Sequence, residues 1–129
     1  MPGHILIVEN EPDIVDVMRR YLEFEGFRIV SVATCKEARV SCAARLPDLI
    51  VLDWHLPDTD GDEWVEELRA HGATADIPII MMTGGYPTPA LNAQLTAAHI
   101  PLLIKPFSLD QLVEQIKGMI TRERAIGVV

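Results

Sequence analysis

The amino-acid sequence predicts an α/β fold: one parallel sheet of five strands with helices on both faces. Strand-length apolar runs alternate five times with segments of helical periodicity, a repeat typical of parallel sheets joined by right-handed crossovers. The first, third and fourth runs are almost continuously aliphatic, as central strands covered on both faces are. The predicted strands are Ile5–Val8, Arg28–Val32, Leu49–Leu52, Ile77–Met82 and Leu102–Ile104.

The first two helices are indicated by residues at their ends. The first begins at Pro12, because proline is favoured in the first turn, and stops at Gly26, a typical C-terminal residue. The second begins at Thr34, and Glu37 three residues later completes the pattern of a capping box. This helix is predicted to run to Arg45, shortly before a proline.

The remaining three helices differ in how clearly the sequence marks them. The third starts near Asp60 to Glu63, where acids suit the positive end of a helix, and closes at Gly72. The fourth covers roughly Ala90 to Ala98 and has a weak apolar stripe. The fifth covers Ser108 to about Thr121, with Ser108 and Gln111 as a capping box and a strong apolar stripe.

Composition narrows the classes of protein. The 129 residues, 49% of them hydrophobic, predict a single domain over residues 1–129 with a core from about 4 to 121. The net charge of −8 and the lack of a basic patch argue against nucleic-acid binding and favour cations or basic partner surfaces. The apolar runs are too short to cross a membrane. Residues Met1 to His4 lack a signal pattern, so a cytoplasmic location is expected.

The cysteines and histidines suggest no chemistry. Cys35 and Cys42 are seven residues apart in a predicted helix, which separates them by about 10 Å along its axis. A disulfide needs Cα atoms within about 7 Å, so both are interpreted as small buried or half-buried side chains. The four histidines show no paired spacing for a metal and are expected on the surface or in loops.

The polar residues that follow the strands form the candidate site. Glu9, Asn10 and Glu11 follow the first strand, Asp53 the third, Thr83 the fourth and Lys105 the fifth. In such sheets ligands bind at the carboxyl ends of the strands. Each residue alone has an ordinary interpretation as a solvated acid, a strand end or a turn. Their joint placement at four strand ends favours a shared site.

This set of side chains suits phosphoryl transfer. Mg²⁺ prefers one or two carboxylates together with waters and a phosphate. An aspartate beside such a cation is a competent nucleophile toward phosphorus, and a lysine and a hydroxyl can hold the remaining phosphoryl oxygens. A nucleotide-binding P-loop is excluded, because the chain has no Gly-rich segment ending in Lys-Ser or Lys-Thr.

At this point the sequence resembles a response-regulator receiver domain, the phosphoacceptor module of two-component signalling. The resemblance covers Ile5 to about Thr121. It rests on ILIVENEPDI (Ile5–Ile14), PDLIVLDWHLPDTDG (Pro47–Gly61), IPIIMMTG (Ile77–Gly84) and LLIKPF (Leu102–Phe107). The family implies a flavodoxin-like, doubly wound sheet in the order 2-1-3-4-5 with five helices.

The resemblance also implies roles for single residues. Asp53 matches the aspartate that accepts a phosphoryl group from a histidine kinase. Mg²⁺, or Mn²⁺ in its place, would be held by Glu9, Asn10, Asp53 and the main-chain carbonyl of His55. Glu11 is interpreted as a helix-start acid rather than a further ligand.

Thr83 matches the switch hydroxyl of the family and Lys105 the lysine that pairs with the phosphoryl group. The peptide bond from Lys105 to Pro106 is usually cis in the family. Such a domain is not a turnover enzyme: it phosphorylates itself from the donor and loses the group in a Mg²⁺-dependent reaction.

Two positions depart from the family pattern. Asn10 stands where an acid usually contacts the metal; a unit charge about 4 Å away is worth on the order of 4 kcal/mol at an effective dielectric near 20. We therefore expect Mg²⁺ affinity to be lower by roughly tenfold or more. Leu102 occupies the position of the aromatic switch residue and cannot give the same rotamer signal. Tyr86 in the preceding loop is a candidate for a partial substitute, although an exposed or core-edge tyrosine is the more ordinary interpretation.

Three hypotheses follow. The leading one is a receiver phosphorylated on Asp53 that changes its partner binding. The alternative is an atypical receiver that binds proteins without phosphorylation, for which Asn10 and Leu102 speak. An aspartate-nucleophile phosphatase is disfavoured, because His55 stands where that class needs a second acid.

The expected partners follow from the leading hypothesis. They are a histidine kinase or phosphotransfer protein, and a downstream protein or output domain outside this chain. A homodimer through the face of the fourth helix, fifth strand and fifth helix is a further candidate. The cognate kinase, and whether the chain stands alone or is part of a larger regulator, stay open.

Overall fold

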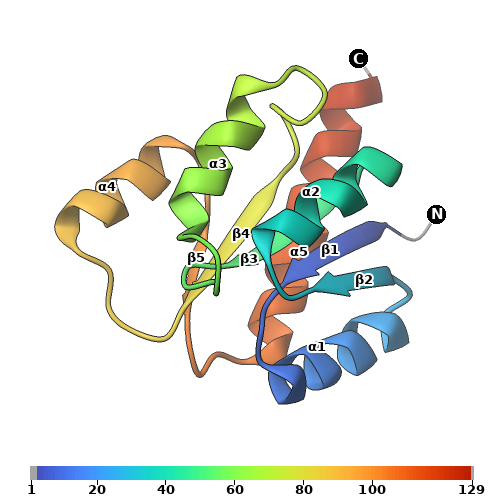
Figure 1. The fold of residues 1–129 in the computed structure, drawn as a ribbon. Coiled ribbons are helices and arrows are strands. Elements are labelled where there is room, and N and C mark those ends of the chain that lie inside the picture. Colours follow the sequence, from blue (N-terminus) through green and yellow to red (C-terminus); the bar gives the residue numbers. More distant parts are fainter. Residues whose placement is uncertain (1–2, 129) are drawn as a thin grey trace.

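The structure, a computed structural model, describes residues 3–128, with side chains for residues 3–120. Strands and helices alternate along this part of the chain (Figure 1). The strands are β1 (His4–Val8), β2 (Arg28–Val32), β3 (Leu49–Asp53), β4 (Ile79–Thr83) and β5 (Leu102–Ile104). The helices are α1 (Pro12–Phe24), α2 (Cys35–Ala44), α3 (Gly61–Ala70), α4 (Pro89–Ala97) and α5 (Leu109–Val128).

All neighbouring strands are parallel, and their order is β2-β1-β3-β4-β5. This confirms the predicted α/β class and the flavodoxin-like order. Every residue of β1, β3 and β4 is buried, which explains why these strands are continuously aliphatic. No helix among residues 3–128 is both long and apolar enough to span a bilayer.

Two hydrophobic clusters fill the space on either side of the sheet. Alternate residues of each strand point to opposite faces. Leu6 and Leu52 pack on the face covered by α2, α3 and α4. Ile7 and Val51 pack on the other face, against α1 and α5. Because both faces are covered, the polar residues that a ligand could reach lie at the ends of the strands.

Two sequence-based bounds were clearly wrong. β4 begins at Ile79 rather than Ile77, because Pro78 has no N–H and only its carbonyl joins the sheet, accepting from Ile50 N at 2.9 Å. α5 continues to Val128, past the predicted end near Thr121.

His4 was expected on the surface or in a loop, and this too was wrong. It is the first residue of β1 and is 5% exposed, with its backbone N–H bound to Asp48 Oδ2 at 2.7 Å. The other three histidines are exposed.

Two helix starts show the side-chain caps that the sequence predicts, with one backbone bond of the capping box at α2 and both at α5. Thr34 is the N-cap of α2, and its hydroxyl accepts from Glu37 N at 3.1 Å. Ser108 and Gln111 make both bonds of the capping box before α5, each at 3.3 Å. These contacts satisfy N–H groups that a helix leaves free in its first turn.

Both cysteines lie on α2, and both are free and buried, as expected. Burial is the main cause that raises the pKa of the Cys35 thiol to about 12. Burial likewise raises the pKa of Cys42. Neither thiol is therefore ionised at neutral pH, which fits a packing role.

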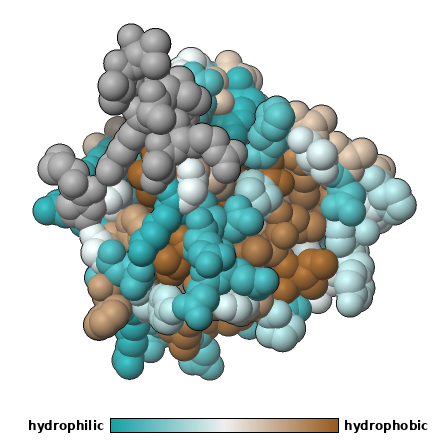
Figure 2. Space-filling model, turned by 180° about the vertical axis from the view of Figure 1, so that it is seen from behind, coloured by the Kyte–Doolittle hydropathy of each residue, from teal (hydrophilic) through white to brown (hydrophobic). Residues whose placement is uncertain are grey.

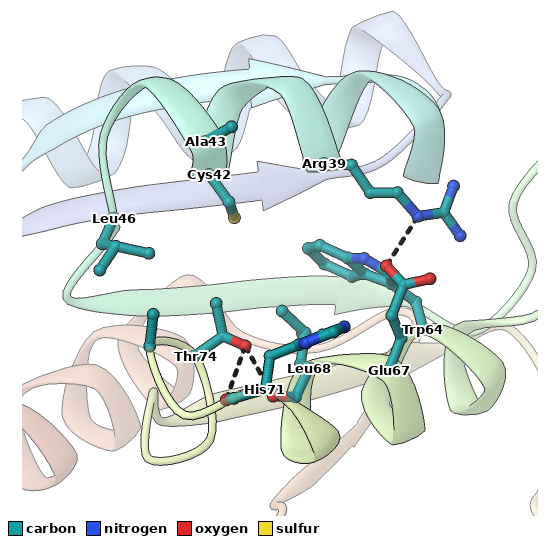
Figure 3. A pocket seen from close by; sticks show the side chains of 10 residues that line it. Arg39, Cys42, Ala43, Leu46, Trp64, Glu67, Leu68, His71 and Thr74 are labelled. Atoms are coloured by element: carbon teal, nitrogen blue, oxygen red, sulfur yellow. Dashed lines mark hydrogen bonds and ion pairs between the residues drawn. The ribbon is translucent and has the colours of Figure 1, made fainter.

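Helices α2 and α3 lie side by side and bound a groove of about 490 Å³. Trp64 and Leu68 of α3 line it, and both are buried in the core. Across its opening Arg39 Nε of α2 meets Glu67 Oε2 of α3 at 2.7 Å (Figure 3). This ion pair and the shared core join the two helices.

Gly61 lies so close to the end of β3 that a side chain there would meet backbone atoms. A Cβ there would lie 2.9 Å from the carbonyl oxygen of Asp53 and 3.3 Å from the Cα of Trp54. We expect Gly61→Ala to lower the free energy of unfolding by about 1–3 kcal/mol, because backbone at the end of β3 must shift. Urea unfolding measures this change.

Gly118→Ala is the matched control. Gly118 lies inside α5, and a Cβ added there would have no neighbouring atom within 4 Å, so alanine should stabilise the protein by about 0.5–1 kcal/mol. A Gly61→Ala variant as stable as the unchanged protein would contradict the close approach of α3 to β3.

Candidate functional site

The polar residues at four strand ends gather at one edge of the sheet. Glu9 follows β1, Asp53 ends β3, Thr83 ends β4 and Lys105 follows β5. Glu9, Asp53 and Thr83 are only 2%, 4% and 5% exposed. Buried polar side chains are costly unless they are paired, so their contacts decide what the site can do.

Glu9 is a buried carboxylate held by three donors. Its Oε2 accepts the backbone N–H of Asn10 at 2.9 Å and that of Glu11 at 3.3 Å. Its Oε1 accepts from Lys105 Nζ. The two amides belong to the chain that enters α1, so the start of α1 fixes this carboxylate in place.

Lys105 bridges the two buried carboxylates. Its Nζ donates to Asp53 Oδ2 at 3.4 Å as well as to Glu9, and lies 3.9 Å from Glu11 Oε1. Burial alone lowers the pKa of Lys105, but the hydrogen bond to Glu9 and the charges of Asp53 and Glu9 outweigh it, so its pKa is raised. Lys105 is therefore a stable cation at the centre of the site.

The pKa of Asp53 is higher than that of a surface aspartate. Burial, followed by the hydrogen bond and charge of Glu9, raises the pKa of Asp53 from 3.8 to about 6. Lys105 and the N–H of His55, which donates to Asp53 Oδ1 at 3.3 Å, act in the opposite direction. Two carboxylates thus share one ammonium, and the site carries an excess of negative charge.

The donor set is compatible with a hard divalent cation. Residues 3–120 contain no group of three or more His, Cys, Asp or Glu side chains arranged for a metal. However, Mg²⁺ takes only one or two carboxylates and completes its shell with neutral oxygens and water. Glu9 and Asp53 supply two carboxylates, and Asn10, which is exposed, lies next to Glu9. Burial and the neighbouring Glu9 raise the pKa of Asp53, and a cation there would offset the repulsion between the two carboxylates.

Thr83 is placed beside Lys105 through the main chain. Lys105 N donates to Thr83 O at 2.7 Å, and the Thr83 hydroxyl accepts from Gly85 N at 3.3 Å. The peptide bond between Lys105 and Pro106 is cis, as the resemblance implied. The hydroxyl and the ammonium therefore come from adjacent strand ends.

The switch positions are less buried than the charged ones. Leu102 is half-buried and packs against the core on the α2 and α3 face. Tyr86 is 91% exposed, so its ring does not fill a place left by an aromatic at Leu102. His55 is also exposed at the end of β3, with its side chain 3.7 Å from Asp60.

Sequence reasoning missed Asp58. Its carboxylate binds the first two backbone amides of α2, more than twenty residues earlier in the chain. The stretch Pro57-Asp58-Thr59-Asp60 offers two acids, and nothing local indicates which of them reaches another helix. Only the paired orphan amides at the start of α2 could have suggested a partner.

Comparisons with known proteins agree with this geometry. A family model described as the response regulator receiver domain matches residues 5–117. The phosphate regulon transcriptional regulatory protein PhoB of Rhizobium meliloti (strain 1021) is 36% identical over 121 residues, covering 93% of this chain and 53% of PhoB. The response regulator SaeR of Staphylococcus aureus (strain USA300) is 34% identical over 119 residues, covering 92% of this chain and 51% of SaeR. The chain thus spans about half the length of these relatives.

Solved structures show the same similarity. A CheY-like response regulator receiver domain protein from Methanospirillum hungatei JF-1 superposes with a TM-score of 0.86 and 28% identity, covering 97% of this chain and 98% of that one. The N-terminal domain of a response regulator receiver protein from Methanoculleus marisnigri JR1 gives 0.74 and 33%, covering 90% and 94%. The chain belongs to the response regulator receiver domains of two-component systems.

Proposed function

We propose that this chain accepts a phosphoryl group on Asp53 from the phosphohistidine of a histidine kinase or phosphotransfer protein. The observation that carries the proposal is the environment of Asp53. Its carboxylate is buried and paired with Lys105, and the neighbouring carboxylate of Glu9 repels its negative charge. Receiver domains are signalling modules rather than turnover enzymes, and this chain is proposed to act as one such domain over residues 1–129.

The transfer needs few changes at the site. An ionised carboxylate oxygen of Asp53 attacks phosphorus, the bond from phosphorus to the imidazole nitrogen breaks, and that nitrogen leaves with the electron pair. Lys105, already beside Asp53, then balances the charge of the acyl phosphate. The Thr83 hydroxyl lies at the neighbouring strand end, where it can donate to a phosphoryl oxygen once it leaves its contact with Gly85.

Mg²⁺, or Mn²⁺ in its place, is proposed to be held by Glu9, Asn10, Asp53 and the main-chain carbonyl of His55. When bound, the cation supplies positive charge against the phosphoryl oxygens during transfer and during the later loss of the group. Asn10 contributes a neutral oxygen, so it adds less attraction than a carboxylate would.

The phosphodonor is proposed to dock beside Lys105. A groove of about 690 Å³ between α1 and the start of α5 includes Lys105 itself and an apolar wall that contains Ile14, Val17 and Phe107. Val17 is 52% exposed. Apolar surface next to an anionic reaction centre suits a helix that presents a histidine. Because kinases form the phosphohistidine from ATP, the proposal implies a cytoplasmic location.

The downstream partner is proposed to bind the face made by α4, β5 and α5, which could equally pair two copies of the chain. Viewed from behind, hydrophobic surface lies beside the hydrophilic outer face of α5 on the side of β5 (Figure 2). Ile104, the last residue of β5, is 37% exposed. The shift of Thr83 would reach this face through Leu102, without an aromatic ring.

The alternative, a receiver that binds partners without phosphorylation, is not favoured. Its support was the replacement of two family residues by Asn10 and Leu102. Glu9, Asp53 and Lys105, which carry the charges needed for transfer, lie in mutual contact through the ammonium of Lys105.

Phosphorylation tests the proposal directly. Incubation with acetyl phosphate and Mg²⁺ should add one phosphoryl group, detected by intact-protein mass spectrometry, because Asp53 is a nucleophile beside Lys105. The Asp53→Asn variant should gain none. Asp60→Asn is the matched control, since Asp60 is an exposed acid in the loop that follows Asp53, and it should be phosphorylated normally. Equal labelling of Asp53→Asn would rule out Asp53 as the acceptor.

Asn10→Asp should tighten Mg²⁺ binding by roughly tenfold or more, because it adds a negative charge next to Glu9. A Mg²⁺ titration followed by tryptophan fluorescence measures the dissociation constant; Trp54 adjoins Asp53 in the chain. Asp13→Asn, a change on exposed α1 surface, is the control. An unchanged constant in Asn10→Asp would show that residue 10 is not a ligand.

The raised pKa of Asp53 makes a prediction for stability. Between its ordinary value of 3.8 and about 6, the unfolded chain ionises Asp53 while the folded protein keeps it protonated, so stability falls as pH rises through this window. Removing the charge of the Asp53 carboxylate should therefore increase the free energy of unfolding more at high pH than at low pH. Asp53→Asn should stabilise the protein more at about pH 8 than at about pH 4 in urea unfolding. The same effect at both pH values would contradict the raised pKa.

A further inference from the structure

Asp58 joins the loop that follows Asp53 to a distant helix. It lies in loop 55–60, the part of the connection between β3 and α3 that follows Trp54. Its Oδ1 accepts the backbone N–H of Cys35 at 3.1 Å and its Oδ2 that of Lys36 at 3.0 Å. Both amides belong to the first turn of α2. One carboxylate thus binds two N–H groups from a different part of the chain.

These two bonds complete the cap of α2. The first N–H groups of a helix have no partner within it. Thr34 accepts from Glu37, and the fourth amide, that of Ala38, bonds to Thr34 O at 3.0 Å. Asp58 accepts the two that remain, and its negative charge suits the positive end of the helix.

Helix α2 is a firm anchor for this contact. Cys35, which donates one of the two N–H groups, is 0% exposed, and so is Ala38 one turn later. Further along, the pair between Arg39 and Glu67 ties α2 to α3 (Figure 3). A loop held by the start of α2 is therefore held to the core.

Loop 55–60 otherwise bonds to its own neighbours in sequence. His55 N donates to Asp53 Oδ1, and Leu56 N donates to Thr59 O at 3.3 Å. Among residues 3–120, the hydrogen bonds that link residues 55–60 to an element other than β3 and α3 are the two made by Asp58. Just before this stretch Trp54 N donates to Met82 O of β4 at 2.8 Å, and within it Leu56 is buried in the core. Asp58 is thus the residue that hydrogen-bonds this loop to α2, in addition to the anchorage that Leu56 and Trp54 provide.

We propose that Asp58 is a positioning residue for the Asp53 site: by binding the first two amides of α2, it holds loop 55–60, and with it the main chain of His55, against Asp53. The inference rests on the proposed function, because the loop matters only if the main chain at His55 takes part in cation binding. Asp58 itself touches no reacting atom.

The test compares two ways of weakening the same helix cap. Asp58→Ala removes the link between loop and helix, whereas Thr34→Ala removes a cap whose side-chain hydrogen bonds are made with Glu37 of α2. Asp58→Asn keeps one acceptor oxygen, which can bind one of the two amides. Its effects should therefore be intermediate between those of Asp58→Ala and Thr34→Ala. The readouts are the Mg²⁺ dissociation constant without phosphodonor, amide hydrogen exchange of residues 54–60, and the rate of phosphorylation by acetyl phosphate.

Asp58→Ala is expected to weaken Mg²⁺ binding and slow phosphorylation by about tenfold, the usual effect of losing a residue that orients a ligand. Faster exchange in residues 54–60 should accompany it. Thr34→Ala should change neither Mg²⁺ affinity nor exchange in the loop, although both variants lower the melting temperature. Equal Mg²⁺ affinities in the two variants would overturn the inference.

The outcomes separate this inference from the proposed function. If the unchanged protein binds Mg²⁺ but is not phosphorylated, the proposed function fails, and the Mg²⁺ and exchange data still decide the role of Asp58. If the unchanged protein does not bind Mg²⁺ at all, the inference is overturned with it. If Asp58→Ala does not fold, Asp58→Asn takes its place in the comparison with Thr34→Ala.

Discussion

The structure depends on one ammonium group placed between two buried carboxylates. Lys105, at the end of β5, binds Glu9 from the end of β1 and Asp53 from the end of β3. Without this cation, two acids would be buried close to one another, which is costly in a medium of low polarity. The parallel order of the strands brings the three residues to the same edge, so the topology and the charge pairing support each other.

The pairing is incomplete, because Lys105 offers one positive charge to two buried carboxylates. Burial, together with the hydrogen bond and charge of Glu9, keeps the pKa of Asp53 well above that of a surface aspartate. The folded protein therefore holds a carboxylate that gains from any additional positive charge. In the proposed function a divalent cation and then a rearranged Lys105 and Thr83 supply that stabilisation. The two buried carboxylates destabilise the fold at the edge of the sheet, while the aliphatic core on both faces stabilises it.

Local signals predicted much of the fold. The aliphatic runs located β1 and β3, Pro12 marked the start of α1, and Ser108 with Gln111 formed the capping box that their spacing indicated. The meeting of Asp53 with Lys105 also followed from the sequence, because Asp53 ends one strand and Lys105 directly follows another strand of the same parallel sheet. By contrast, no local pattern indicates the bond from the His4 backbone N–H to Asp48, which is 44 residues away. The bond between Asp58 and the N–H of Cys35 likewise depends on how α2 and α3 pack on the sheet. No local sequence pattern determines that packing.

The most direct test of this account is the pKa of the Asp53 carboxyl group, measured by ¹³C NMR without metal in the unchanged protein and in Lys105→Met. Methionine keeps most of the length of the side chain and removes its charge. The account predicts a value of about 6 in the unchanged protein and a clearly higher one in Lys105→Met, because Glu9 would then act on Asp53 unopposed. An ordinary value in the unchanged protein, or no rise in the variant, would contradict the claim that Lys105 balances two buried carboxylates.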